Sequence, residues 1–230
     1  MPLLELLTSS SLGSLLGMRH ALEPDHLAAV STLVTHERNI RKAALLGVCW
    51  GLGHTLSLVA VGAALVLLRA EMPAYAADLF EFFVALMLVG LGLRAIYLAS
   101  RQGAAGPAHV HRHGGVVHQH AGALAHVHVG RWTLARRPLL VGAVHGLAGS
   151  GALTALVLAT LPSTSARLAY MLLFGLGSTA GMAALSGLLG WPMARIGRHA
   201  LFARALSLLV GCLSAGLGVF WGYPLLARVF

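Results

Sequence analysis

Residues 19–30 read RHALEPDHLAAV and place an arginine, two histidines, a glutamate and an aspartate inside an otherwise apolar stretch. Ionisable side chains at membrane depth are costly to insert unless they are paired or face a polar cavity, so they mark functional positions. This segment therefore predicts a functional site within a membrane-spanning region.

The composition around this segment agrees with a membrane protein. Of the 230 residues, 57% are hydrophobic and 10% are charged, whereas soluble domains carry roughly 25% charged residues. Apolar runs of about 20 residues, the length that crosses a bilayer as a helix, recur along the whole chain. We expect an all-α, polytopic membrane protein with six transmembrane helices at residues 4–33, 43–69, 79–100, 138–161, 168–190 and 203–227.

The basic residues predict the orientation in the membrane. The net charge is +9, but the 15 arginines and one lysine lie between apolar segments, which disfavours nucleic-acid binding. Cytoplasmic loops are enriched in Lys and Arg, so the odd-numbered loops are predicted to lie in the cytoplasm and both termini outside the cytoplasmic membrane. The odd loops hold Arg38, Arg41, Lys42, Arg101, Arg112, Arg131, Arg136, Arg137, Arg195, Arg198 and Arg204, against Arg69, Arg167 and Arg228 on the other side.

An internal repeat appears when the second half is shifted back by about 125 residues. His20-Ala-Leu then aligns with His145-Gly-Leu, and GLGHT at 51–55 aligns with GLGST at 175–179. Three spans in each half force opposite orientations, which is the inverted-repeat plan of many secondary transporters. The predicted organisation is a first three-helix repeat at 1–100, a His-rich cytoplasmic loop at 101–137 and a second three-helix repeat at 138–230.

The donor atoms of the first motif suit a transition metal. Two imidazoles and a carboxylate favour nickel, cobalt, copper or zinc, whereas magnesium and calcium prefer oxygen donors. On a straight helix His20, Asp25 and His26 would not share a face. Pro24 disfavours a helical conformation at the preceding residue, so a discontinuous first helix is expected. The alternative is a structural polar cluster, for instance with an Arg19–Glu23 ion pair and with Asp25 hydrogen-bonded to a helix.

Two further histidines lie in other apolar segments. His54 is flanked by glycines in GLGHTLSL, and His145 begins HGLAGSGAL. The repeat makes His145 the counterpart of His20, whereas Ser178 stands in place of His54. The glycines at 146–151 indicate close helix packing or an unwound turn. His54, and with less support His145, are therefore added to the predicted metal ligands.

These motifs resemble the nickel/cobalt transporter family, and within it the compact six-span permeases of the urease-accessory type. The resemblance rests on the His-Ala-x3-Asp-His string of residues 20–26, the Gly-x-Gly-His of the second span and HGLAGSGAL. It implies uptake of nickel or cobalt as substrate, no resident cofactor and no enzymatic activity. The residues that it implies for metal handling are His20, Asp25, His26 and His54.

The long loop holds seven of the thirteen histidines. Paired His-x-His segments bind borderline metals, so the loop is predicted to hold metal in the cytoplasm or to deliver it, and a cytoplasmic metallochaperone is a possible partner. A linker without consequence is the alternative, because the stretch is rich in Gly and Ala and is not expected to pack. The loop ligands are His109, His111, His113, His118, His120, His126 and His128.

Three other functions compete with uptake. Inverted repeats present one site to both sides in turn, so efflux is equally compatible with the motifs. A thiol-redox protein would bring Cys49 and Cys212 together, and a metal sensor would need the loop. The partners expected here are a divalent metal ion and the lipid bilayer, without nucleic acid; the oligomeric state stays open.

Overall fold

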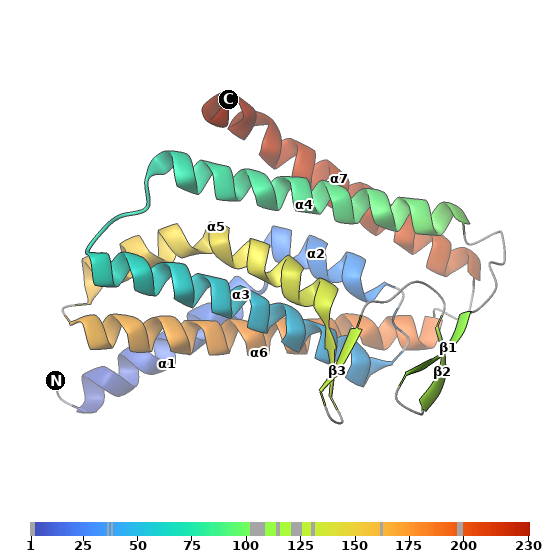
Figure 1. Ribbon diagram of the computed structural model, residues 1–230, viewed down its shortest axis with the longest axis horizontal. Helices are drawn as coiled ribbons and strands as arrows, with labels where there is room; N and C mark the ends of the chain where they lie inside the picture. The colour runs from blue at the N-terminus through green and yellow to red at the C-terminus, as the bar shows by residue number, and fades with distance from the viewer. Residues whose placement is uncertain are drawn as a thin grey trace.

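The computed structural model describes residues 3–35, 37, 39–101, 109–113, 116–120, 126–129, 132–161, 163–196 and 200–230. Seven helices form its main body (Figure 1). They are α1 (Leu3–His20), α2 (Pro24–Val34), α3 (Ile40–Leu68), α4 (Ala74–Arg101), α5 (Arg136–Thr160), α6 (Thr164–Ile196) and α7 (Ala200–Val229).

The first predicted span is broken, as the proline indicated. Helix α1 ends at His20 and α2 begins at Pro24. Glu23 between them is extended, with φ −64° and ψ 148°, because a residue before proline avoids the helical region. Proline suits the first turn of a helix, where its missing N–H would have no partner. The break therefore follows directly from the local sequence.

Four of the helices are long and apolar enough to cross a membrane. Within the part of the chain that the structure describes, these spans are Ile40–Leu68, Ala74–Arg101, Thr164–Trp191 and Leu201–Val229. Helix α2 has 11 residues, too few to cross a bilayer alone. Helix α5 covers the fourth predicted span. The chain is a helical, multi-pass membrane protein, and the count of six spans stays a prediction.

Close helix contacts are made at glycines and occur in matched pairs. A Cβ atom at Gly51 would lie 2.6 Å from Thr179 Cα, and one at Gly175 would overlap the side chain of Thr55. The hydroxyls of Thr55 and Thr179 lie 2.9 Å apart. Small residues let helices approach closely in a membrane, so α3 and α6 pack backbone to backbone at the centre of the bundle.

Three further pairs follow the same pattern. The partners in each pair are offset by about 125 residues, as in the sequence repeat. In the first pair Gly17 faces Phe174 and Gly142 faces Trp50. In the second Gly53 faces Leu139 and Gly177 faces Ser14. In the third Gly92 faces Ala215 and Gly218 faces Val89.

The loop between α4 and α5 contains regular structure that the sequence did not lead us to expect. Strands β1 (His109–His113) and β2 (Val116–His120) form one antiparallel pair, and β3 (His126–Val129) and β4 (Trp132–Ala135) form another. The description as all-α therefore holds for the bundle and is wrong for this loop. Alternation of histidine with valine has the two-residue period of a strand, which explains the difference.

The hairpins and the N terminus lie at opposite ends of the bundle (Figure 1). The connections from α3 to α4 and from α5 to α6 lie at the N-terminal end. Arg38, Arg131 and Arg198, which entered the orientation count, lie outside the described residues.

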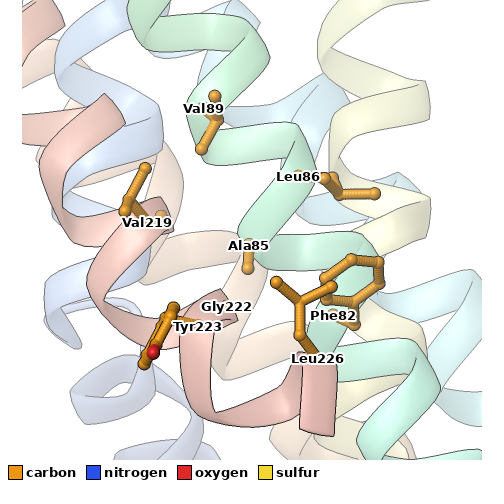
Figure 2. A pocket seen from close by; sticks show the side chains of 9 residues that line it. Phe82, Ala85, Leu86, Val89, Val219, Gly222, Tyr223 and Leu226 are labelled. Carbon is orange, nitrogen blue, oxygen red and sulfur yellow. The ribbon is translucent and has the colours of Figure 1, made fainter. Parts of the chain in front are cut away.

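An apolar groove of about 310 Å³ lies between α4 and α7 (Figure 2). Its walls include Phe82, Leu86 and Leu226. It contains no metal-ligating side chain and is separate from the site described next.

Candidate metal centre

Five side chains from four helices meet near the break between α1 and α2. We call His20, Asp25, His26, His54 and His145 the histidine cluster. His20 ends α1, Asp25 and His26 begin α2, and His54 and His145 come from α3 and α5. All five were expected from the sequence, and the structure brings all five together in two overlapping groups.

The first group joins His20, His26 and His54. The Nε2 atoms of His20 and His54 lie 3.3 Å apart, and the rings of His20 and His26 have centroids 4.5 Å apart. This proximity exists because the chain turns between α1 and α2. One ligand atom from each side chain lies within 4.8 Å of the others, a separation that a metal ion can bridge.

The second group joins Asp25, His26 and His145. One carboxylate oxygen, Asp25 Oδ1, lies 3.0 Å from His26 Nδ1, and the other, Oδ2, lies 3.2 Å from His145 Nε2. The backbone N–H of His26 donates to Oδ1 at 2.8 Å. Asp25 lies in the first turn of α2, where the helix dipole favours a negative charge. The carboxylate is thus held between two imidazoles.

Glycines place His54 and His145 next to this turn. A Cβ atom at Gly53 would overlap the carbonyl oxygen of Leu139, and one at Gly146 would overlap that of His54. Helices α3 and α5 can approach this closely only because these side chains are absent. Helix α5 stays helical through residues 146–151, so this segment is not an unwound turn, and Gly146 marks close packing.

Several nitrogens of the cluster have no hydrogen-bond partner among the described residues. They are His26 Nε2, His54 Nδ1 and His145 Nδ1, all buried. A buried polar atom without a partner is rare in proteins and calls for an explanation such as a bound ion. His26, His54 and His145 are 2%, 0% and 2% exposed, so water does not satisfy them readily.

Three residues that sequence reasoning did not assign to the site lie against it. Glu23 Oε1 lies 2.9 Å from His20 Nδ1, so Glu23 contacts His20 and not Arg19, the partner named as an example in the alternative interpretation. The Trp50 ring lies 5.4 Å from that of His26, and Phe174 lies 5.4 Å from His20. The i, i+4 spacing of Trp50 and His54 on one helix was the sequence feature that could have indicated that Trp50 lies at the site.

The loop histidines are separate from this cluster along the chain. In the first hairpin His109 pairs with His120 and His111 with His118, so four histidines occupy directly opposed positions. In the second hairpin His126 and His128 oppose Ala135 and Thr133. Metal binding by the loop stays a prediction.

The cysteines give no support to a redox site. Cys49 is buried in α3, Cys212 is exposed on α7, and both are free thiols.

Comparison with known proteins identifies the family. Residues 6–220 match the family described as high-affinity nickel-transport protein. The chain belongs to this family. It is also 32% identical over 227 residues to the urease accessory protein UreH of Bacillus sp. (strain TB-90), an alignment that covers 96% of this chain and 93% of that protein. No solved structure gives a significant match.

Membership of the nickel-transport family confirms the resemblance drawn from the motifs. The protein is a membrane transporter of a divalent transition metal, with nickel as substrate, and it is not an enzyme. The match extends over both halves of the chain and includes the whole histidine cluster.

Proposed function

We propose that the protein takes up nickel, or cobalt, across the cytoplasmic membrane as a secondary transporter and binds the ion at the histidine cluster. The observation that carries this proposal is the convergence of four imidazoles and one carboxylate, most of them buried, on one point between four helices. Neutral imidazole and carboxylate are the ligands that borderline divalent metals accept. No resident cofactor is needed for this activity.

The chemistry of the cluster suits a transported ion better than a permanent one. Structural metal sites are closed by four protein ligands, whereas each group here offers three. Open positions let an ion enter with part of its water shell and leave again. Glu23, 53% exposed beside His20, adds a negative charge that attracts a cation toward the first group.

The proposed transport route uses two inverted three-helix repeats, residues 1–100 and 138–230. The matched glycine contacts support this plan, because a two-fold relation between the halves requires each contact to have a counterpart. Thr55 and Thr179, which occupy equivalent positions and contact each other, would lie near the axis. Rocking of one half against the other would then expose the cluster to each side in turn.

We further propose that both termini lie outside and that residues 101–137 lie in the cytoplasm. The excess of arginine in the odd-numbered loops supports this orientation. The loop would then hold nickel after its release or present it to a metallochaperone. The first hairpin, with its opposed histidines, is the stronger candidate for this role.

Accumulation of radioactive nickel in cells tests the proposal. Cells that express the wild type should accumulate more nickel than cells without it, and His20→Ala should abolish the difference because His20 belongs to the first group. Leu213→Ala, which truncates an exposed residue of α7, is the matched control and should retain transport. Reduced accumulation with the wild type would instead establish efflux, and full transport by His20→Ala would exclude the cluster as the binding site.

A further inference from the structure

The histidine cluster has more donors than one ion needs, and they are arranged around a single residue. Two groups of three side chains can each hold a metal ion: His20 with His26 and His54, and Asp25 with His26 and His145. Only His26 belongs to both. If the proposed function holds, this arrangement defines how an ion would move through the site.

His26 lies between the two groups. Its ring centroid is 4.5 Å from that of His20, in an edge-on contact, and 4.4 Å from that of His145, in a stacked contact. Its Nδ1 atom faces the Asp25 carboxylate at 3.0 Å, and its Nε2 atom is buried without a partner among the described residues. An imidazole has two nitrogens, and either one can ligate a metal when it carries no proton.

The two groups are also similarly buried. Each has one partly exposed member, since the side chain of His20 is 15% exposed and that of Asp25 is 14% exposed. Their other members are buried.

The two groups differ in their donor atoms and in the half of the chain that supplies the flanking histidine, His20 or His145. His20 and His145 hold matching positions in the sequence repeat, so each half contributes one of the two flanking histidines. The first group is made of three nitrogens, whereas the second adds a carboxylate oxygen. Two divalent cations in both groups at once would share His26 and repel each other at close range, so we expect one ion at a time.

We propose that the cluster is two overlapping positions for one ion, and that transport passes the ion from one to the other with His26 as the shared ligand. The ion is held by the flanking histidine of one half before the transfer and by that of the other half after it. Because His26 belongs to both groups, an ion that stays on one of its nitrogens exchanges two ligands at a time and not three. A single-position site would give no reason for His20 and His145 to fall into different groups that share His26.

Titration with Co²⁺ tests this proposal, because its visible absorption reports the number and type of ligands. The full-length chain with its seven loop histidines replaced by alanine, purified in detergent, should bind one equivalent at the cluster, and the variants below are made in this background. His20→Ala and His145→Ala should each still bind one equivalent. Their spectra should differ from one another because different donors remain. Their affinity for Co²⁺ should fall by about 100-fold or less, which is roughly the effect of losing one ligand. His26→Ala should weaken binding more than either.

Nickel uptake into liposomes completes the test. Both flanking variants should bind Co²⁺ yet fail to transport nickel, because each lacks one end of the transfer. His20→Gln and His145→Gln, which keep a side chain of similar length, serve as second variants if the alanine forms do not fold.

Three outcomes would overturn the proposal. The cluster would be one site if either flanking variant lost Co²⁺ as completely as His26→Ala, or if the spectra of the two flanking variants were identical. Binding of two equivalents by the chain that lacks the loop histidines but keeps the cluster would exclude a single transferred ion. The titration decides between one position and two even if wild-type liposomes take up no nickel, in which case the proposed function fails separately.

Discussion

The segment after His20 and the segment after His145 begin alike and continue differently. His20 is followed by a turn and by Pro24, and a second helix begins there. His145 is followed by glycines, and α5 continues without a break to Thr160. The first segment consequently contributes three members of the cluster and the second contributes one. The break, more than the number of histidines, determines where the ligands gather.

The glycine contacts, unlike the metal ligands, are matched between the two halves of the chain. Gly17 and Gly142 hold matching positions, and each faces a backbone carbonyl of the opposite half, that of Phe174 or of Trp50. Packing at these contacts is therefore shared, whereas ligand chemistry is concentrated in one half. The predictions below test the shared packing first and the asymmetric chemistry afterwards.

The largest effect is expected from Gly17→Ala and Gly142→Ala. Each adds a methyl group where the carbonyl oxygen of the neighbouring helix already lies, and overpacking of this kind costs about 1–3 kcal/mol of stability. Both variants should unfold at lower temperature in detergent than the wild type. Thermal unfolding is measured by heating each variant and quantifying the protein that remains folded by size-exclusion chromatography.

Gly90→Ala and Gly216→Ala are the matched controls for this test. A Cβ atom at either position meets no atom within 4 Å, and alanine favours a helix over glycine. These two variants should be as stable as the wild type or slightly more so. If Gly17→Ala were destabilised and Gly142→Ala were not, the two halves would not share their packing.

Pro24→Ala addresses the break itself and should have the next largest effect. Alanine lets a helix continue from α1 toward α2, which would turn His26 away from His20. We expect Co²⁺ affinity and nickel uptake both to fall, with the protein still folded. Pro224→Ala, which removes the proline inside α7, should leave metal binding intact. Unchanged binding by Pro24→Ala would mean that packing, not proline, maintains the turn.

Acidification should weaken transport more gradually. Imidazole has an ordinary pKa of about 6.5, and only its neutral form binds metal. Because protons compete with the ion for four histidines, uptake should be complete above that pKa and should decline as the pH falls below about 6. Liposomes with the same pH on both sides, assayed at about pH 5 and about pH 7.5, would show this. Equal rates would argue against histidine ligation.

Much of the site could be predicted from sequence, for reasons that particular residues make clear. Charged and imidazole side chains in an apolar segment identified His20, Asp25 and His26, and the proline before Asp25 predicted the break. Contacts across helices were harder to foresee, because no local pattern links Trp50 to His26 or Phe174 to His20. The strands of the loop were missed because its glycines and alanines outweighed the alternation of histidine and valine.

The smallest effect is expected from the loop, and it separates the histidines of the helices from those of the hairpins. Deleting residues 105–130 removes all seven loop histidines and leaves the cluster untouched, so nickel accumulation should persist at most of its wild-type level. Replacing the seven by alanine preserves the loop length and isolates their chemistry. If the protein is a transporter, both variants retain nickel uptake, and the purified variants bind less metal than the purified wild type. Loss of accumulation in the alanine variant would show that the ion must pass from the buried cluster to the loop before it leaves the protein.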